Sequence, residues 1–209
     1  MVDVYRLRSP LAHLALEARA GIDADISGTG ITISEIPHQG LINLRGDAAD
    51  TAFVAAVEKA IKLAPPAAAN TYAGKTATRI AWLGPDEWLV VTRPDAAERT
   101  FKGLNKTLKS EGMHAAVTSV GDARTCIRIS GPCAREVLQK GCSIDLHPSR
   151  FGPGQCVQAI VSKVGVILLQ TADGAKTGPT YELYVLRSFA TFLWAWLEDA
   201  SAEYGVKIA

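Results

Sequence analysis

The stretch INLRGD, residues Ile42–Asp47, opens an Ala-rich run with helical spacing, and a stretch of similar design, IRISGP, follows at Ile127–Pro132. Downstream of the first lies Gly84–Val91, a Gly-Pro turn that leads into an apolar strand pattern. Downstream of the second lies Gly178–Val185, which repeats that design. A further helical pattern follows each. Internal repetition of this kind indicates a duplicated unit. The chain therefore reads twice as strand, helix, hairpin strands and helix.

The repetition predicts an N-terminal arm (1–30), a first repeat half (31–112) and a second repeat half (113–209), with the two halves forming one compact pseudo-twofold unit. Ile31–Ile36 alternates apolar and polar residues, as a half-buried strand does. We expect Leu41–Arg45 to be its hairpin partner. The fold class is α+β, with antiparallel sheets and helices packed on one face of each.

Composition excludes several functional classes. Among 209 residues, 22 are basic and 21 acidic, which gives a formal net charge of +1. A nucleic-acid-binding protein needs basic residues massed on one face, so this balance argues against that class. No stretch approaches the roughly 20 apolar residues of a membrane span, and the N-terminus lacks the features of a secretory signal. We expect a cytoplasmic protein that contacts neither nucleic acid nor membrane.

Residue types that carry chemistry are scattered along the chain. No zinc-protease, nucleophile-elbow or P-loop motif is present. The cysteines form no C-x-x-C pair, and the histidines lack metal-ligand spacing, although a cluster formed in space stays open. We therefore predict no catalytic, cofactor-binding or metal-binding residue in this chain. The cysteines and histidines concerned are Cys126, Cys133, Cys142, Cys156, His13, His38, His114 and His147.

Two motifs have a functional and a structural interpretation. Asp86 and Glu87 are adjacent carboxylates beside Trp88, and acid–base catalysis would require one of them to be desolvated. A hairpin tip is normally hydrated, so the turn interpretation is favoured. Gly28–Gly30 resembles a phosphate-binding turn, but it precedes a strand and not a helix, which indicates a simple loop.

The ends of the chain supply candidates for partner contacts. On the closing helix we expect a buried stripe that includes Phe189, Phe192, Leu193, Trp196, Leu197 and Ala200. Trp194 points away from that stripe; either another chain binds it, as suits an interface tryptophan, or the other half of the duplication covers it. In the arm, Leu7, Leu11 and Leu14 predict a short amphipathic helix that could fold against a partner.

Several segments together resemble the gamma-subunit family of heterotetrameric sarcosine oxidases, and they span nearly the whole chain. The Gly-Pro-Asp-Glu-Trp part of Leu83–Leu89 is shared with the wider superfamily of the glycine-cleavage T protein, so alone it identifies only that superfamily. The segments are Ser9–Leu11, Leu83–Leu89, Ile129–Leu138, Asp145–Pro148 and Phe189–Trp196.

The resemblance implies a complex of alpha, beta, gamma and delta chains that oxidises sarcosine to glycine and hydrogen peroxide. The complex transfers the one-carbon unit to tetrahydrofolate. FAD, FMN and NAD are then expected in the large chains and zinc in the delta chain, with no cofactor in this one. The implied fold is a duplicated β-β-α-β-β-β-α unit. The implied role is a non-catalytic structural subunit, with Trp194 and the N-terminal arm as candidate contacts.

A free-standing folate-binding protein of the T-protein type is the alternative. Lys140–Cys142 resembles the lysine-glycine-cysteine motif of a folate-dependent iron–sulfur repair branch. Here, however, the motif lies at a predicted helix end, and Ser143–Asp145 does not continue it. Titration with tetrahydrofolate distinguishes the two hypotheses, because a structural subunit predicts no specific binding.

Overall fold

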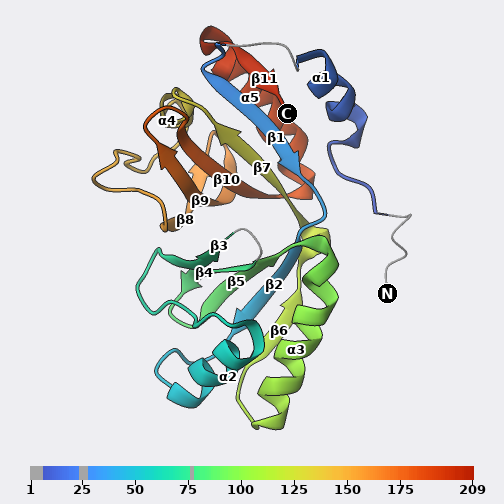
Figure 1. Cartoon of the computed structure of the whole chain (residues 1–209), viewed down its shortest axis with the longest axis vertical. Helices are drawn as coiled ribbons and strands as arrows, with labels where there is room; N and C mark the ends of the chain where they lie inside the picture. Colours follow the sequence, from blue (N-terminus) through green and yellow to red (C-terminus); the bar gives the residue numbers. More distant parts are fainter. Residues whose placement is uncertain (1–6, 24–27, 76–77) are drawn as a thin grey trace. The chain divides into compact units, whose positions relative to one another are not determined.

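The computed structural model describes residues 7–23, 28–75 and 78–209. It forms two compact α+β units (Figure 1). Unit 1 combines the chain up to His38 with Ala123–Ala209, and unit 2 comprises Gln39–Asp122. The α+β prediction is confirmed. These compact units do not coincide with the repeat halves 31–112 and 113–209, because each unit takes strands from both sides of residues 112 and 113.

Unit 2 is a five-stranded antiparallel sheet in the order β3-β4-β5-β2-β6. Asp50 caps α2 by accepting a hydrogen bond from the Ala52 amide at 2.8 Å. Helices α2 and α3 pack with one sheet face around Phe53, Trp88 and Leu104. Its elements are β2 (Gly40–Arg45), α2 (Thr51–Ile61), β3 (Tyr72–Lys75), β4 (Thr78–Gly84), β5 (Glu87–Thr92), α3 (Ala97–Ser110) and β6 (Ala116–Ser119).

Unit 1 is a six-stranded sheet in the order β11-β1-β7-β10-β9-β8, antiparallel except for the parallel pair β1–β11. Apolar residues of β10 (Tyr181, Leu183 and Val185) point into a core that includes residues of α4 and α5. Its elements are α1 (Leu16–Ile22), β1 (Ile31–Ile36), β7 (Arg124–Ser130), α4 (Ala134–Gln139), β8 (Cys156–Val161), β9 (Val164–Gly174), β10 (Gly178–Leu186), α5 (Ala190–Ser201) and β11 (Val206–Ile208).

The predicted hairpin between residues 31–36 and 41–45 is wrong. Strand β1 pairs with β7, with Ile33 opposite Ile129, whereas β2 pairs with β5 and β6 in the other sheet. Between the two strands His38 has a φ of 60°. The alternation of apolar and polar residues that identifies a strand does not specify its partner, so a short connection was mistaken for a hairpin turn.

The order of elements repeats along the chain. From β1 to α3 it is β-β-α-β-β-β-α, and from β6 to α5 the same order recurs. Strand order repeats as well: β3-β4-β5-β2-β6 in unit 2 corresponds to β8-β9-β10-β7-β1 in unit 1, with β11 added. The segment from β1 to α3 therefore contributes its first strand, β1, to the sheet of unit 1. The segment from β6 to α5 contributes its first strand, β6, to the sheet of unit 2. The element order agrees with the predicted double pattern.

Candidate functional site

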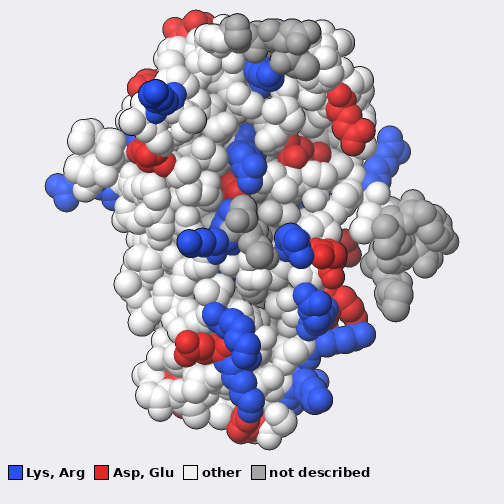
Figure 2. All heavy atoms as spheres, viewed as in Figure 1, with Lys and Arg blue, Asp and Glu red and all other residues white. Residues whose placement is uncertain are grey.

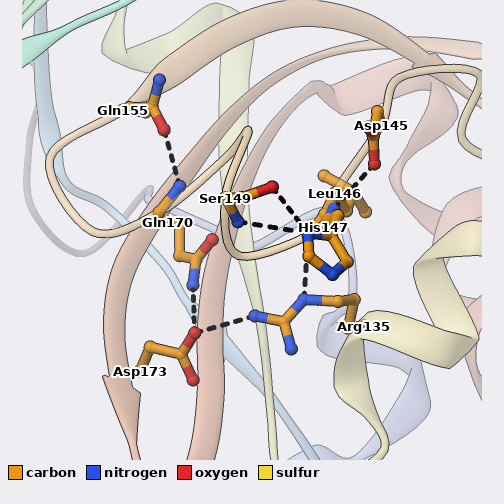
Figure 3. Close-up of polar contacts among 9 residues, drawn as sticks. Arg135, Asp145, Leu146, His147, Ser149, Gln155, Gln170 and Asp173 are labelled. Atoms are coloured by element: carbon orange, nitrogen blue, oxygen red, sulfur yellow. Dashed lines mark hydrogen bonds and ion pairs between the residues drawn. The ribbon is translucent and has the colours of Figure 1, made fainter.

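A polar cluster in unit 1 joins α4, β9 and the loop before β8 (Figure 3). Arg135 of α4 donates from Nε to the Leu146 carbonyl oxygen and from Nη2 to Asp173 Oδ2, both at 2.8 Å. The amide nitrogen of the Gln170 side chain donates to the same carboxylate oxygen at 3.2 Å. Because one guanidinium binds both the loop backbone and a strand carboxylate, the cluster fixes the loop against the sheet.

The loop itself is held by local hydrogen bonds. Asp145 Oδ1 accepts from the His147 amide at 2.9 Å, and His147 Nδ1 lies 2.8 Å from Ser149 Oγ. The Gln155 side chain accepts from the Gly152 amide at 2.6 Å. The Gln155 carbonyl accepts from the Gln170 amide (Figure 3). His147 is exposed, and its ring takes part in the local hydrogen bonds of this turn through Ser149.

The phenol of Tyr181 on β10, which interacts with Arg135 of this cluster, has a shifted pKa. Burial raises the pKa of its phenol to about 12, although the Arg135 guanidinium opposes that shift. A phenol with this pKa stays protonated near neutrality and cannot act as a base there. Arg135 and Asp173 neutralise each other, so the arrangement offers rigidity and no activated group. Sequence reasoning missed it, because no motif relates Arg135 to Asp173.

The two carboxylates at the hairpin tip of unit 2 are paired with a cation. Arg45 Nη2 lies 3.3 Å from Asp86 Oδ1 and 3.4 Å from Glu87 Oε2. Asn43 donates to Glu87 Oε1 at 2.7 Å. Arg45 and Asp86 line an open hollow of about 640 Å³, together with Asp50 and His114 among other residues. Asp86 lies in the turn between β4 and β5, as its turn interpretation predicts, and Glu87 is the first residue of β5.

Metal ligands do not gather within the described ranges: no group of three or more His, Cys, Asp or Glu residues there could hold an ion. Cys126, Cys142 and Cys156 are buried free thiols, and Cys133 is half-buried.

Over the same described residues, no helix has the length and apolar content needed to cross a membrane. Basic and acidic side chains both occur on the face drawn in Figure 2.

The Lys140–Cys142 motif holds α4 against the C-terminal part of unit 1. Lys140 Nζ donates to the Ala200 carbonyl oxygen at 2.5 Å, forms an ion pair with Glu203 and lies 4.8 Å from the centre of the Tyr204 ring. Burial raises the pKa of the Cys142 thiol, which keeps it protonated and poorly nucleophilic. These contacts favour a structural role for the motif.

Trp194 is only 1% exposed and belongs to the unit 1 core, so the prediction that it points away from the buried stripe is wrong. Phe189 and Phe192, expected in the core, are instead 46% and 45% exposed. Helix α5 carries apolar residues around most of its circumference, so periodicity could not select its buried face. Its buried residues are Ala190, Leu193, Trp194, Leu197, Ala200 and Ser201.

The N-terminal arm packs on unit 1. Leu11 is fully buried in the core, Leu14 is partly buried against it, and Leu7 is 37% exposed. Arg19 of α1 forms an ion pair with Glu198, one helical turn beyond Trp194 on α5. Leu11 and Trp194 therefore have little surface left for a partner, which corrects their assignment as contacts. The contact roles of Leu7 and Leu14 stay predictions.

Exposed apolar side chains that sequence reasoning missed lie elsewhere in unit 1. Ile160 on β8 is 58% exposed and Leu186 at the end of β10 is 37% exposed, and both line a hollow of about 530 Å³. Strand alternation places both residues on the sheet face opposite the helices. Only a weak signal in the sequence pointed to such exposed apolar side chains, namely strands that are apolar on both faces.

Comparison with known proteins gives consistent matches. Residues 45–203 match the Sarcosine oxidase, gamma subunit family. The sarcosine oxidase subunit gamma of Corynebacterium sp. (strain U-96) is 30% identical over 207 residues, covering 98% of this chain and 95% of the relative. That of an Arthrobacter sp. is 28% identical over 204 residues, covering 94% and 91%.

Solved structures agree with these matches. A chain of the heterotetrameric sarcosine oxidase from Corynebacterium sp. U-96 superposes with a TM-score of 0.81 at 30% identity, covering 94% of this chain and 95% of that one. The glycine cleavage system aminomethyltransferase T from Bartonella henselae superposes with a TM-score of 0.65 at 16% identity, covering 92% and 57%. The second likeness shows the T-protein-like fold.

Proposed function

This chain belongs to the sarcosine oxidase gamma subunit family, and we propose that it serves as the non-catalytic structural gamma subunit of a heterotetrameric sarcosine oxidase. The complex would demethylate sarcosine oxidatively to glycine, with formation of hydrogen peroxide and 5,10-methylenetetrahydrofolate, in the cytoplasm. Alpha, beta and delta chains would be its partners and would carry FAD, FMN, NAD and zinc. The repeated element order further supports an origin by duplication of one β-β-α-β-β-β-α unit.

The observation that carries this proposal is the match to a gamma subunit over nearly the full length of both chains, in sequence and in structure. The polar groups support a structural role. Arg45, Arg135 and Lys140 are each paired with carboxylates of this chain. Tyr181 keeps its proton near neutrality. Groups that are already neutralised hold elements together and are poorly suited to acid–base catalysis.

The test is co-expression of the four chains with an affinity tag on this one. We expect the flavin-containing chains to co-elute, with sarcosine oxidation in the eluate. If this chain elutes alone while the remaining chains assemble into an active enzyme, the proposal is wrong. Titration of the isolated chain with tetrahydrofolate, followed by calorimetry, tests the folate-binding alternative: saturable binding would favour a free-standing folate protein.

A further inference from the structure

Strand β6 is an edge of the unit 2 sheet, whereas the corresponding strand of unit 1 is covered by a further strand. In the repeated strand order β6 corresponds to β1, because β6 pairs with β2 and β1 pairs with β7. In unit 1, β11 pairs in parallel with the other side of β1. Within the described residues, no strand lies beyond β6. One sheet therefore has an added strand at the place where the other sheet ends.

The two strand pairs also share one register. In unit 2, Val117 lies opposite Leu44. In unit 1, Ile33 lies opposite Ile129. Leu44 and Ile129 are the third residues of the two repeated stretches INLRGD and IRISGP, so Val117 corresponds to Ile33. Since Ile33 pairs with Ile208 of β11, the position beside Val117 is the one that a strand equivalent to β11 would occupy.

The burial of these two corresponding residues differs. Ile33 is fully buried in the unit 1 core, to which Ile208 of β11 also belongs. Val117 packs against the unit 2 core but is only partly buried. Strand β6 thus lacks the apolar cover that β11 gives to β1. An apolar side chain at the place of Ile208 would remove more of Val117 from water, which favours association.

The backbone of β6 is oriented to pair with such a strand. Next to β6, the Val120 amide donates to the Leu41 carbonyl oxygen at 2.8 Å. Because hydrogen-bonded and non-hydrogen-bonded pairs alternate along antiparallel strands, the amide and carbonyl of Val117 point away from β2. At the corresponding position of unit 1, the Ile33 carbonyl accepts from the Ala209 amide at 3.1 Å. The outward groups of Val117 therefore match those that β1 uses to bind the C-terminal strand.

The other sheet edges in the described part of the chain carry features that limit strand addition. On β11, the Ile208 amide donates to Asp23 Oδ2 at 2.9 Å. At the end of β8, Cys142 forms an isolated bridge. Strand β3 contains a lysine and Gly74, which has a φ of 96°. Strand β6, with the sequence AVTS, has no charged residue, no proline and no bulge. Edges without such features are open to pairing with another chain.

We propose that the β6 edge receives an extended segment of another chain of the oxidase, which adds to the unit 2 sheet in parallel as β11 does in unit 1. The inference rests on the proposed function. In binding by strand addition, main-chain hydrogen bonds give affinity and alternate side chains give specificity. The segment should carry an apolar residue at the place of Ile208. A second copy of this chain does not fit, because identical edges that continue a sheet across a twofold axis run antiparallel.

Val117→Pro tests the strand addition, because proline removes the outward amide and no hydrogen bond to β2. In the co-expressed four-chain complex, we expect the fraction of this variant that co-purifies with the other chains to fall about tenfold, as loss of a main-chain hydrogen bond with a steric block does. Val117→Ala is the matched control, because it shortens the side chain and keeps the amide. It should assemble nearly as well as wild type. Equal losses in both variants would overturn the inference.

Amide hydrogen exchange makes the test independent of the stability of the variants. The Val117 amide of the wild-type chain should exchange about tenfold more slowly, or more slowly still, in the complex than in the isolated chain. Unchanged exchange in an assembled complex would overturn the inference. If the wild-type chain does not assemble at all, the proposed function is wrong. A wild-type dimer of the isolated chain that Val117→Pro converts to a monomer would assign the edge to a second copy and also overturn the inference.

Discussion

Arg128 on β7 and Glu182 on β10 lie directly opposite each other, with 2.8 Å between Arg128 Nη2 and Glu182 Oε1. Glu182 is fully buried and also accepts a hydrogen bond from the Tyr184 hydroxyl at 2.7 Å. A buried carboxylate that loses its cationic partner is strongly destabilising. We expect Arg128→Met to lower the free energy of unfolding by roughly 3 kcal/mol in urea titrations.

The double variant Arg128→Met/Glu182→Gln is the matched control, because it removes both charges together and leaves a side-chain carbonyl to accept from Tyr184. It should recover most of the lost stability, since no unpaired charge then remains buried. Equal losses in the single and double variants would show that the pair does not explain the effect.

Arg135 should control the order of the loop between α4 and β8. Arg135→Ala removes the hydrogen bond to the Leu146 carbonyl and the ion pair with Asp173. We expect amide hydrogen exchange in Leu146–Phe151 to become about tenfold faster or more, because a charge-assisted contact contributes about 1.5–3 kcal/mol to local stability. Arg93→Ala, whose ion pair with Asp95 is exposed, should leave that loop unchanged.

Truncation of Trp194 and of Phe192 should differ in its effect on the free energy of unfolding. Trp194→Ala leaves a cavity in the unit 1 core and should cost about 3–5 kcal/mol in equilibrium unfolding. Phe192→Ala should change stability by about 1 kcal/mol or less, because its side chain is 45% exposed. A stable, fully folded Trp194→Ala variant would contradict the buried position of this indole.

The phenol of Tyr181 should titrate late. Burial raises its pKa to about 12 in the folded chain, compared with about 10 in an unfolded one. The folded state therefore holds the proton more tightly, so this group destabilises the fold as pH rises from about 10 to 12. Difference absorbance of wild type against Tyr181→Phe should show ionisation near pH 12. A midpoint near pH 10 would mean that the phenol is solvated.

Local signals in the sequence accounted for the elements better than for their partners. The alternation of Ile31–Ile36 identified a strand, and the repeated Gly-Pro turns identified the order of elements. The pairing of Ile33 with Ile129 is non-local, and nothing in the alternation of β1 distinguishes it from pairing with β2. The exchange of β1 and β6 between the two sheets could therefore be recognised only in the structure.

The surface was harder to predict than the core. Phe189 immediately precedes helix α5, which contains Phe192, Trp194 and Trp196, so a three-dimensional fold was needed to decide which of these aromatic side chains are buried. Likewise, the hollow lined by Ile160 and Leu186 depends on the register of three strands, which no sequence spacing records.

Native mass spectrometry of the enzyme purified from its own host tests most directly whether this chain is a structural gamma subunit. We expect a complex in which one copy of this chain accompanies one copy each of the alpha, beta and delta chains. The flavins should remain with the larger chains after this chain is dissociated. An active sarcosine oxidase that lacks this chain, or a flavin that leaves together with it, would contradict a structural gamma subunit.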